Sequence, residues 1–134
     1  LIHEMLAKID ISSDVENVVA TYVNQGVLNV EDSKKIENKI KSIVYHLELE
    51  NYFSENVTVF NEREITTISN EIIIPDRLVY ENEDVTIIDY KTGKPSKKYQ
   101  QQLLKYEQVL KNMNIKVNKK LLIYIDDEIL IEEV

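Results

Sequence analysis

The spacing of the apolar residues changes near residue 54, and this change constrains the fold of the chain more than any other feature. Before it, apolar residues recur every three or four positions, which is typical of helices buried along one face. We expect a capping box of Ser13 and Glu16 to begin the second helix. Gly26 is expected to end that helix, and Asn29 to cap the third. The expected buried stripes are Ile2, Met5, Leu6 and Ile9; Val15, Val18, Val19, Tyr22 and Val23; and Ile36, Ile40, Ile43, Val44 and Leu47.

Residues 57–90 are rich in β-branched side chains and lack helical spacing, which favours strands. The expected strands are Val57–Asn61, Glu64–Ser69, Ile72–Tyr80 and Val85–Tyr90, with a turn at Glu81–Asp84. A helix follows with the stripe Tyr99, Leu103, Tyr106, Leu110 and Met113, and then strands at Lys120–Ile125 and Glu128–Glu132. This order predicts an α/β fold with a mixed central β-sheet flanked by helices, in which about residues 1–53 form a helical part and 54–134 a sheet-containing core.

The composition excludes several classes of protein. With no Cys, the chain cannot form a disulfide framework, a thiolate zinc site, a Cys nucleophile or an iron–sulfur cluster. The longest apolar run, Leu121–Ile125, is far too short to span a membrane, and no signal-peptide pattern opens the chain. These features predict a cytoplasmic protein with no membrane partner. Because the chain begins with Leu1 and its first residues resemble a helix interior, we expect a domain excised from a longer polypeptide.

The charge of the chain is distributed unevenly. The net charge is −8, but residues 91–120 contain nine Lys and one acidic residue, Glu107. A basic third in an acidic chain is typical of a protein that touches an anionic partner with one face. The alternative is a solvated helix face, and charge alone does not separate the two interpretations.

The densest polar motif is Asp89-Tyr90-Lys91, at the end of an apolar strand. Because residues two apart on a strand point to the same face, Asp89 and Lys91 are expected to project together, with Tyr90 packed on the other face. A carboxylate and an ammonium group placed in this way can hold a metal ion and a water molecule together. The alternative is an ordinary surface ion pair.

Asp76 lies on the strand that is expected to pair with this one through the intervening turn. The preceding Pro75 cannot donate to a strand ladder, which indicates a strand edge or a bulge at this point. Two carboxylates on neighbouring strands, 13 residues apart in the sequence, suit a hard divalent ion such as Mg²⁺. The alternative is an ion pair of Asp76 with Arg77 or with a lysine of the turn.

These motifs together resemble a known family. Pro75-Asp76-Arg77, then Asp89-Tyr90-Lys91-Thr92-Gly93, then Gln102-Leu103-Leu104-Lys105-Tyr106 resemble the RecB-like branch of the PD-(D/E)XK nucleases. These are the nuclease domains attached to helicases of the RecB/AddA/UvrD type. The family pattern begins with a helical His, which His3 matches, so the resemblance spans His3 to Tyr106.

The resemblance implies a restriction-endonuclease-like core and a site for one or two Mg²⁺ or Mn²⁺ ions, with no iron–sulfur cluster. The implied catalytic residues are Asp76, Asp89 and Lys91, of which Lys91 would orient or activate the attacking water and offset charge on the phosphate. The implied metal ligands are His3, Asp76, Asp89 and the backbone carbonyl of Tyr90. Gln102 and Tyr106 would border the site and the DNA strand, and the lysines Lys94, Lys97 and Lys98 are expected to contact phosphates.

Some of these side chains have alternative interpretations. His3 borders an apolar stripe and, taken alone, is typical of a helix surface, whereas Tyr106 lies inside a stripe and can serve packing only. Glu62 and Glu64 can reach the site, although a solvated strand edge is favoured for both. His46 is assigned no function.

The implied function is that of a single nuclease domain, residues 1–134, in the bacterial cytoplasm. It would hydrolyse DNA phosphodiesters with Mg²⁺ or Mn²⁺, as an exonuclease in DNA repair and recombination. Its partners would be single-stranded DNA ends and helicase domains of the same or a partner chain. One alternative is a non-catalytic nuclease-like docking or structural module of a helicase. Another is an unrelated acidic α/β interaction domain that matches the motifs by chance.

Overall fold

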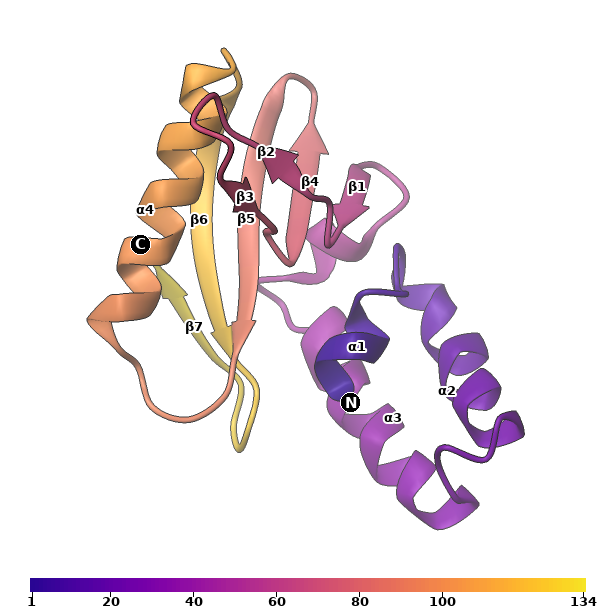
Figure 1. The fold of residues 1–134 in the computed structure, drawn as a ribbon. Coiled ribbons are helices and arrows are strands. Elements are labelled where there is room, and N and C mark those ends of the chain that lie inside the picture. The colour runs from indigo at the N-terminus through magenta and orange to yellow at the C-terminus, as the bar shows by residue number, and fades with distance from the viewer. The chain divides into compact units, whose positions relative to one another are not determined.

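The computed structural model describes residues 1–134 as two compact units, Leu1–Asn56 and Val57–Val134. The first unit is helical, and the second contains all the strands (Figure 1). The helices of the first unit are α1 (Ile2–Leu6), α2 (Val15–Asn24) and α3 (Val30–Val44), with 3₁₀ turns η1 (Ser12–Asp14) and η2 (Glu50–Phe53). No helix of the structure combines the length and the apolar character that crossing a membrane requires.

The helix ends of the first unit follow the sequence signals with one exception. Gly26 has a φ of +75° just after α2, and the Asn29 side chain accepts a hydrogen bond from the backbone N–H of Asp32 at the start of α3. The expected capping box of Ser13 and Glu16 is wrong. A 3₁₀ turn precedes α2, and the Asp14 carboxylate accepts hydrogen bonds from the N–H groups of Asp10 and Ile11, just before that turn.

The buried side chains of the first unit also match the expected stripes in most positions. Val15, Val19 and Tyr22 are buried on α2, whereas Val18 and Val23 are only half-buried. On α3, Ile40, Ile43 and Val44 of the expected stripe are buried, whereas Ile36 is only half-buried. The expectation for Leu47 is wrong, because α3 ends at Val44 and Leu47 lies beyond it with 86% of its surface exposed.

The second unit has a five-stranded mixed sheet with the strand order β1-β4-β5-β6-β7. Its strands are β1 (Thr58–Asn61), β4 (Arg77–Glu81), β5 (Asp84–Lys91), β6 (Lys116–Tyr124) and β7 (Leu130–Glu133). The β5–β6 pair is parallel and the other pairs are antiparallel. Helix α4 (Lys97–Asn112) connects the two parallel strands, as a parallel crossover requires. The predicted α/β fold with a mixed central sheet is confirmed and is consistent with a restriction-endonuclease-like core.

The strand expected over Ile72–Tyr80 is divided into two. Its first part, β3 (Ile72–Ile73), pairs with β2 (Ile65–Thr66) in a separate hairpin, and its second part is β4. The division falls at Ile74-Pro75-Asp76, where Pro75 has no N–H to donate. The chain therefore leaves the hairpin after Ile73 and enters the central sheet at Arg77, just after Asp76.

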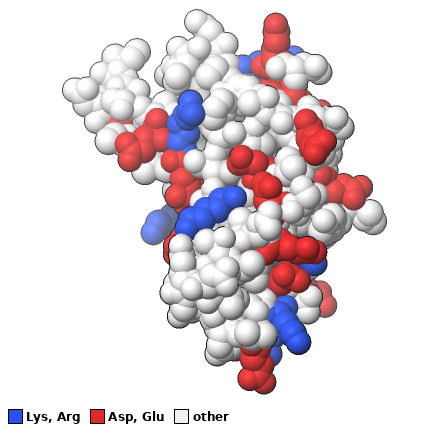
Figure 2. Space-filling view, turned by 90° about the vertical axis from the view of Figure 1, so that its right-hand side faces the viewer, with Lys and Arg blue, Asp and Glu red and all other residues white.

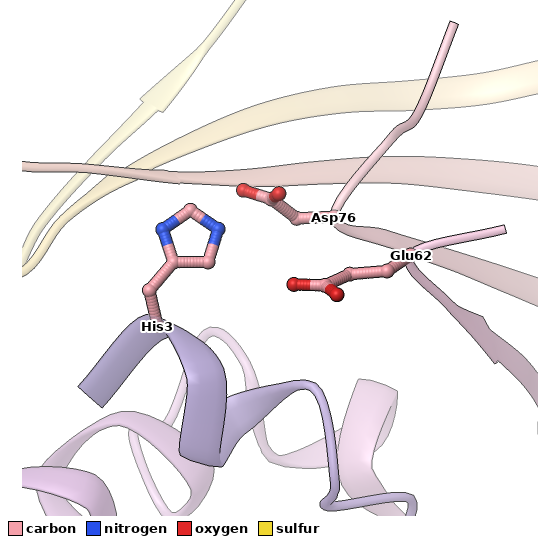
Figure 3. Close-up of side chains that lie close together, drawn as sticks. All are labelled: His3, Glu62 and Asp76. Atoms are coloured by element: carbon pink, nitrogen blue, oxygen red, sulfur yellow. The ribbon is translucent and has the colours of Figure 1, made fainter. Parts of the chain in front are cut away.

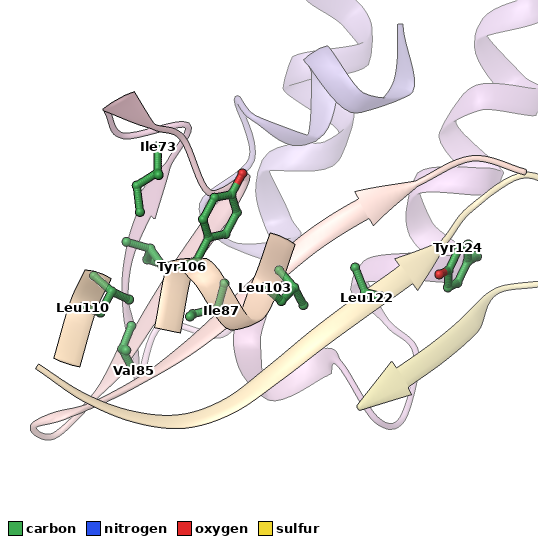
Figure 4. Close-up of a cluster of buried hydrophobic side chains, with 9 residues drawn as sticks. Ile73, Val85, Ile87, Leu103, Tyr106, Leu110, Leu122 and Tyr124 are labelled. Atoms are coloured by element: carbon green, nitrogen blue, oxygen red, sulfur yellow. The ribbon is translucent and has the colours of Figure 1, made fainter. Parts of the chain in front are cut away.

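A buried apolar cluster fixes α4 on one face of the sheet. Leu103, Tyr106 and Leu110 of α4 pack with side chains of the hairpin and the central strands (Figure 4). Those side chains are Ile73, Leu78, Val85, Ile87, Leu122 and Tyr124. The expected α4 stripe is thus confirmed at its centre, whereas Met113 remains 51% exposed. The packing holds the first half of α4 next to the end of β5.

Candidate active site

The pairing of β4 with β5 brings Asp76 and Asp89 together. Arg77 lies opposite Ile88, so the residue before β4 lies beside Asp89. The N–H of Asp76 donates to Oδ1 of Asp89 at 2.9 Å, and the N–H of Tyr90 donates to Oδ2 of Asp76 at 2.9 Å. Each carboxylate is therefore held by a backbone donor of the neighbouring segment. This reciprocal arrangement fixes two acids side by side.

Lys91 emerges on the same face of β5 as Asp89. Its Nζ lies 3.4 Å from Oδ2 of Asp89 and donates to Oε1 of Gln102 on α4 at 2.7 Å. Nε2 of Gln102 in turn donates to the Tyr106 hydroxyl oxygen at 2.9 Å. Tyr90 is buried, as expected of a side chain on the opposite face. The α4 side chains thus set the position of the Lys91 ammonium group.

The two acids create an excess of negative charge in a poorly solvated place. Burial of Asp89, followed by the negative charge of Asp76, raises the pKa of Asp89 from 3.8 to about 6. Burial and the charges of Asp89 and Asp76 also raise the pKa of the Tyr106 hydroxyl to about 12. Lys91 offsets only part of this negative charge. A divalent cation on the carboxylate oxygens would relieve the rest, so the donor set fits a hard metal ion.

Glu62 is a further acid at this site. The β1–β4 register pairs Asn61 with Arg77 and so carries Glu62 to the position opposite Asp76. The N–H of Glu62 donates to the carbonyl oxygen of Asp76 at 3.0 Å. The two side chains offer carboxylate oxygens within 4.8 Å of each other and extend to the same side (Figure 3). Glu62 is exposed, as the strand-edge interpretation expects, but that interpretation missed its proximity to Asp76.

Comparison with models of protein families assigns the chain to a family. The family model of the PD-(D/E)XK nuclease superfamily matches residues 1–132, which include these acids and Lys91. The chain belongs to the PD-(D/E)XK nuclease superfamily. Membership indicates a nuclease that uses divalent metal ions.

Other comparisons with this PD-(D/E)XK chain are less informative. A search of curated proteins gives no match. Among the solved structures that match is one described as "Crystal structure of SSO0001", at 20% identity and a TM-score of 0.41. The match covers 87% of this chain and 61% of the other, so this chain spans about three-fifths of that protein's length.

The other predicted site residues of the PD-(D/E)XK chain lie in three places. His3 is an exposed residue of α1 in the first unit, and its role as a metal ligand stays a prediction. The role of the Tyr90 carbonyl, which follows Asp89 on β5, also stays a prediction. Lys94, Lys97 and Lys98 are exposed in the loop after β5 and the first turn of α4.

The basic third of the sequence does not form a uniformly basic face. Several of its lysines form ion pairs with acidic side chains, which agrees with the interpretation as a solvated helix face. These pairs are Lys105–Glu71, Lys111–Glu107, Lys116–Asp84 and Lys120–Glu107. In Figure 2, acidic side chains are spread across the displayed face and basic ones occur at separate points. No such acid partner is found for Lys94, Lys97 or Lys98 among the ion pairs of the structure, and their contact with phosphates stays a prediction.

Proposed function

We propose that this PD-(D/E)XK chain is a Mg²⁺- or Mn²⁺-dependent deoxyribonuclease. The observation that carries the proposal is the pair of backbone-held acids, Asp76 and Asp89, with the Lys91 ammonium group 3.4 Å from the second. Two carboxylates beside a cation, at the end of a strand, combine the groups that phosphodiester hydrolysis needs. A merely structural ion pair of Lys91 with the buried Asp89 would not need a second acid, the half-buried Asp76, beside it.

Asp76 and Asp89 would hold the metal ion. Glu62 and the Tyr90 carbonyl are further oxygen donors of the same unit, and the resemblance adds His3 of the first unit. Mg²⁺ favours one or two carboxylates, with water and substrate phosphate completing its shell. When bound, the ion supplies a Lewis acid and lowers the pKa of water.

The chain's own side chains would act on the phosphate. Lys91, positioned by Gln102 and Asp89, would offset the negative charge that develops on the phosphoryl oxygens. Tyr106 stays protonated across the neutral range because its pKa is about 12. Its hydroxyl oxygen accepts a hydrogen bond from Gln102, so the O–H remains a donor for that edge of the site.

The nucleic-acid substrate would be DNA, bound through its phosphates. Lys94, Lys97 and Lys98 are exposed beside the site and would contact phosphates without reading bases, so cleavage would be largely indifferent to sequence. The motif order from His3 to Tyr106 supports a RecB-like nuclease. Such a nuclease would act as an exonuclease on single-stranded ends that a helicase delivers during DNA repair or recombination.

The experiment compares Asp89→Ala with Asp84→Ala, a change at the opposite end of the same strand. Asp84 is 37% exposed and its carboxylate faces Lys116 at 3.8 Å, so its loss leaves the site unaltered. Asp89→Ala should abolish Mn²⁺ binding in a calorimetric titration and Mg²⁺-dependent degradation of a single-stranded oligonucleotide together. Asp84→Ala should retain both. If the unaltered chain neither binds Mn²⁺ nor degrades DNA, the docking-module interpretation is favoured instead.

A further inference from the structure

A groove of about 660 Å³ opens beside Lys91 in the second unit. One wall is the exposed face of α4, with Lys98, Gln101 and Lys105. The other wall is formed by Ile72 and Ile74, on and after β3. The groove is therefore basic and polar along the helix, and apolar along the hairpin.

Lys105 of this groove forms an ion pair with Glu71, which lines the adjoining pocket. The Lys105 ammonium group donates to the Glu71 carboxylate, which belongs to the residue before β3. Glu71 is itself held in the hairpin, because its N–H donates to the Thr67 hydroxyl and its carbonyl accepts the Thr67 N–H. Both charged side chains remain about half exposed, at 55% and 54%. Solvent can therefore reach both groups, and an anion in the groove can reach Lys105, which lines it.

We propose that this groove is the path of a single nucleic-acid strand toward Lys91, and that Glu71 competes with the strand's phosphates for Lys105. The proposal rests on the proposed nuclease function and adds to it the surface that binds the strand and an acid that weakens the binding. A phosphate that reaches Lys105 must displace the Glu71 carboxylate.

The α4 wall has suitable spacing for a phosphate backbone. Lys98 and Lys105 are seven residues apart, so they lie on the same helix face at two turns' distance, about 10 Å along the axis. Gln101 lies between them on this wall. Two cations and an amide in a row can follow the phosphates of one strand without reading its bases.

The hairpin wall favours an unpaired strand over a duplex. Ile72 is 59% exposed and Ile74 is 42% exposed, although both are large and apolar. Exposed apolar side chains that gather in a groove indicate a binding surface. The faces of unpaired bases are apolar and accessible, whereas in a duplex they are stacked on one another. The isoleucines can therefore contact the bases of a single strand while the lysines contact its phosphates.

The test measures the affinity of a fluorescent single-stranded DNA oligonucleotide by anisotropy over a series of salt concentrations. EDTA is present, so that a metal-dependent nuclease cannot cleave the probe. The variants are Lys105→Gln and Glu71→Gln. Lys111→Gln is the matched control, because Lys111 lies on the same helix, is equally exposed at 55% and is also paired with an acid. Glu83→Gln, in the exposed β4–β5 turn, controls for the change of net charge.

Lys105→Gln should weaken binding and reduce the slope of log affinity against log salt by about 0.7, the value for one phosphate contact on a single strand. Glu71→Gln should strengthen binding about two- to fivefold, the magnitude of one exposed ion pair. Lys111→Gln and Glu83→Gln should match the unaltered chain in slope and, within about twofold, in affinity.

The proposal is overturned if Lys105→Gln and Glu71→Gln behave like their controls. It is also overturned if a duplex of the same sequence binds as tightly as the single strand and loses as much affinity with Lys105→Gln. Failure of the nuclease proposal has a different signature, because the unaltered chain would then not cleave DNA in Mg²⁺ or Mn²⁺. If the chain cleaves DNA but neither groove variant changes binding, the nuclease proposal stands and the groove is not the path of the strand.

Discussion

Two clusters of acids and lysines in the second unit have opposite charge balances. At Asp89, two acids lie side by side and Lys91 pairs with Asp89, and burial together with the Asp76 charge raises the Asp89 pKa to about 6. At Glu107, one acid is shared by two lysines. Burial opposes ionisation of Glu107, but the hydrogen bond and charge of Lys120, aided by Lys111, lower its pKa. The cluster at Asp89 has more negative than positive charge, whereas the negative charge of Glu107 is fully neutralised by its two lysines. A metal ion would therefore stabilise only the cluster at Asp89.

The largest effect that would sharpen this comparison concerns Glu62. Glu62→Gln should weaken Mn²⁺ binding by about 10–100-fold, the magnitude of losing a supporting group of a metal site. Glu64→Gln is the matched control, since Glu64 is also exposed and lies two residues further along the same connection. Isothermal titration of both variants with Mn²⁺ measures the difference. Equal affinities would remove Glu62 from the site.

His3 is tested in the same way. If it ligates the ion, His3→Ala should weaken Mn²⁺ binding by about 10-fold or more. His46→Ala is the control, because the His46 ring accepts a hydrogen bond from the Glu48 N–H within its own turn. A His3 variant that binds Mn²⁺ as tightly as the His46 variant would leave the ion to the oxygen donors of the second unit.

A smaller effect concerns the stability of the metal-free protein. Because the folded chain binds the Asp89 proton more tightly than the unfolded chain, the free energy of unfolding should fall as the pH rises from about 4 to about 6. It should stay low at higher pH. Asp89→Asn removes this cost, and in EDTA at pH 8 it should raise the free energy of unfolding by about 1–3 kcal/mol. Urea unfolding at pH 5 and pH 8 measures the change.

The smallest effect, of opposite sign, is expected at Glu107. Its lowered pKa contributes stability above the ordinary carboxyl pKa, and this contribution is lost as the pH falls through the lower folded-state value. Glu107→Gln should therefore reduce the free energy of unfolding by about 1 kcal/mol at pH 8. If both variants were destabilising at pH 8, the two clusters would be alike and the contrast between them would be lost.

The acids and the lysine of the site could be predicted from the sequence because local rules place them. Strand alternation puts Asp89 and Lys91 on one face, and the short turn between β4 and β5 fixes the partner of Asp76. Glu62 could not be placed in this way. Its position depends on the β1–β4 register, and the hairpin of β2 and β3 separates those two strands in the sequence.

The other differences have similar physical causes. The first part of β6, Lys116–Lys119, pairs with β5, whereas β7 pairs only from Leu121 onward. This part of β6 is mostly polar. The expected strand, which is based on apolar residues, therefore begins only at Lys120, four residues after the start of β6. The end of α3 at Val44 has no Gly or Pro to mark it, so the apolar spacing extends the expected helix to Leu47, which the helix does not reach. The partners of Lys105 and Lys120 come from tertiary packing, which charge counts along the chain do not reveal.

The most direct test of the catalytic assignment is Lys91→Ala, measured for Mn²⁺ affinity and for Mg²⁺-dependent hydrolysis of single-stranded DNA. Removing a positive charge beside two carboxylates should leave Mn²⁺ affinity unchanged or slightly higher. Hydrolysis should nevertheless fall by about 10²–10³-fold, as expected for an electrostatic group aimed at a transition state. Unchanged hydrolysis in Lys91→Ala, with the metal still bound, would contradict the assignment of this cluster as a nuclease active site.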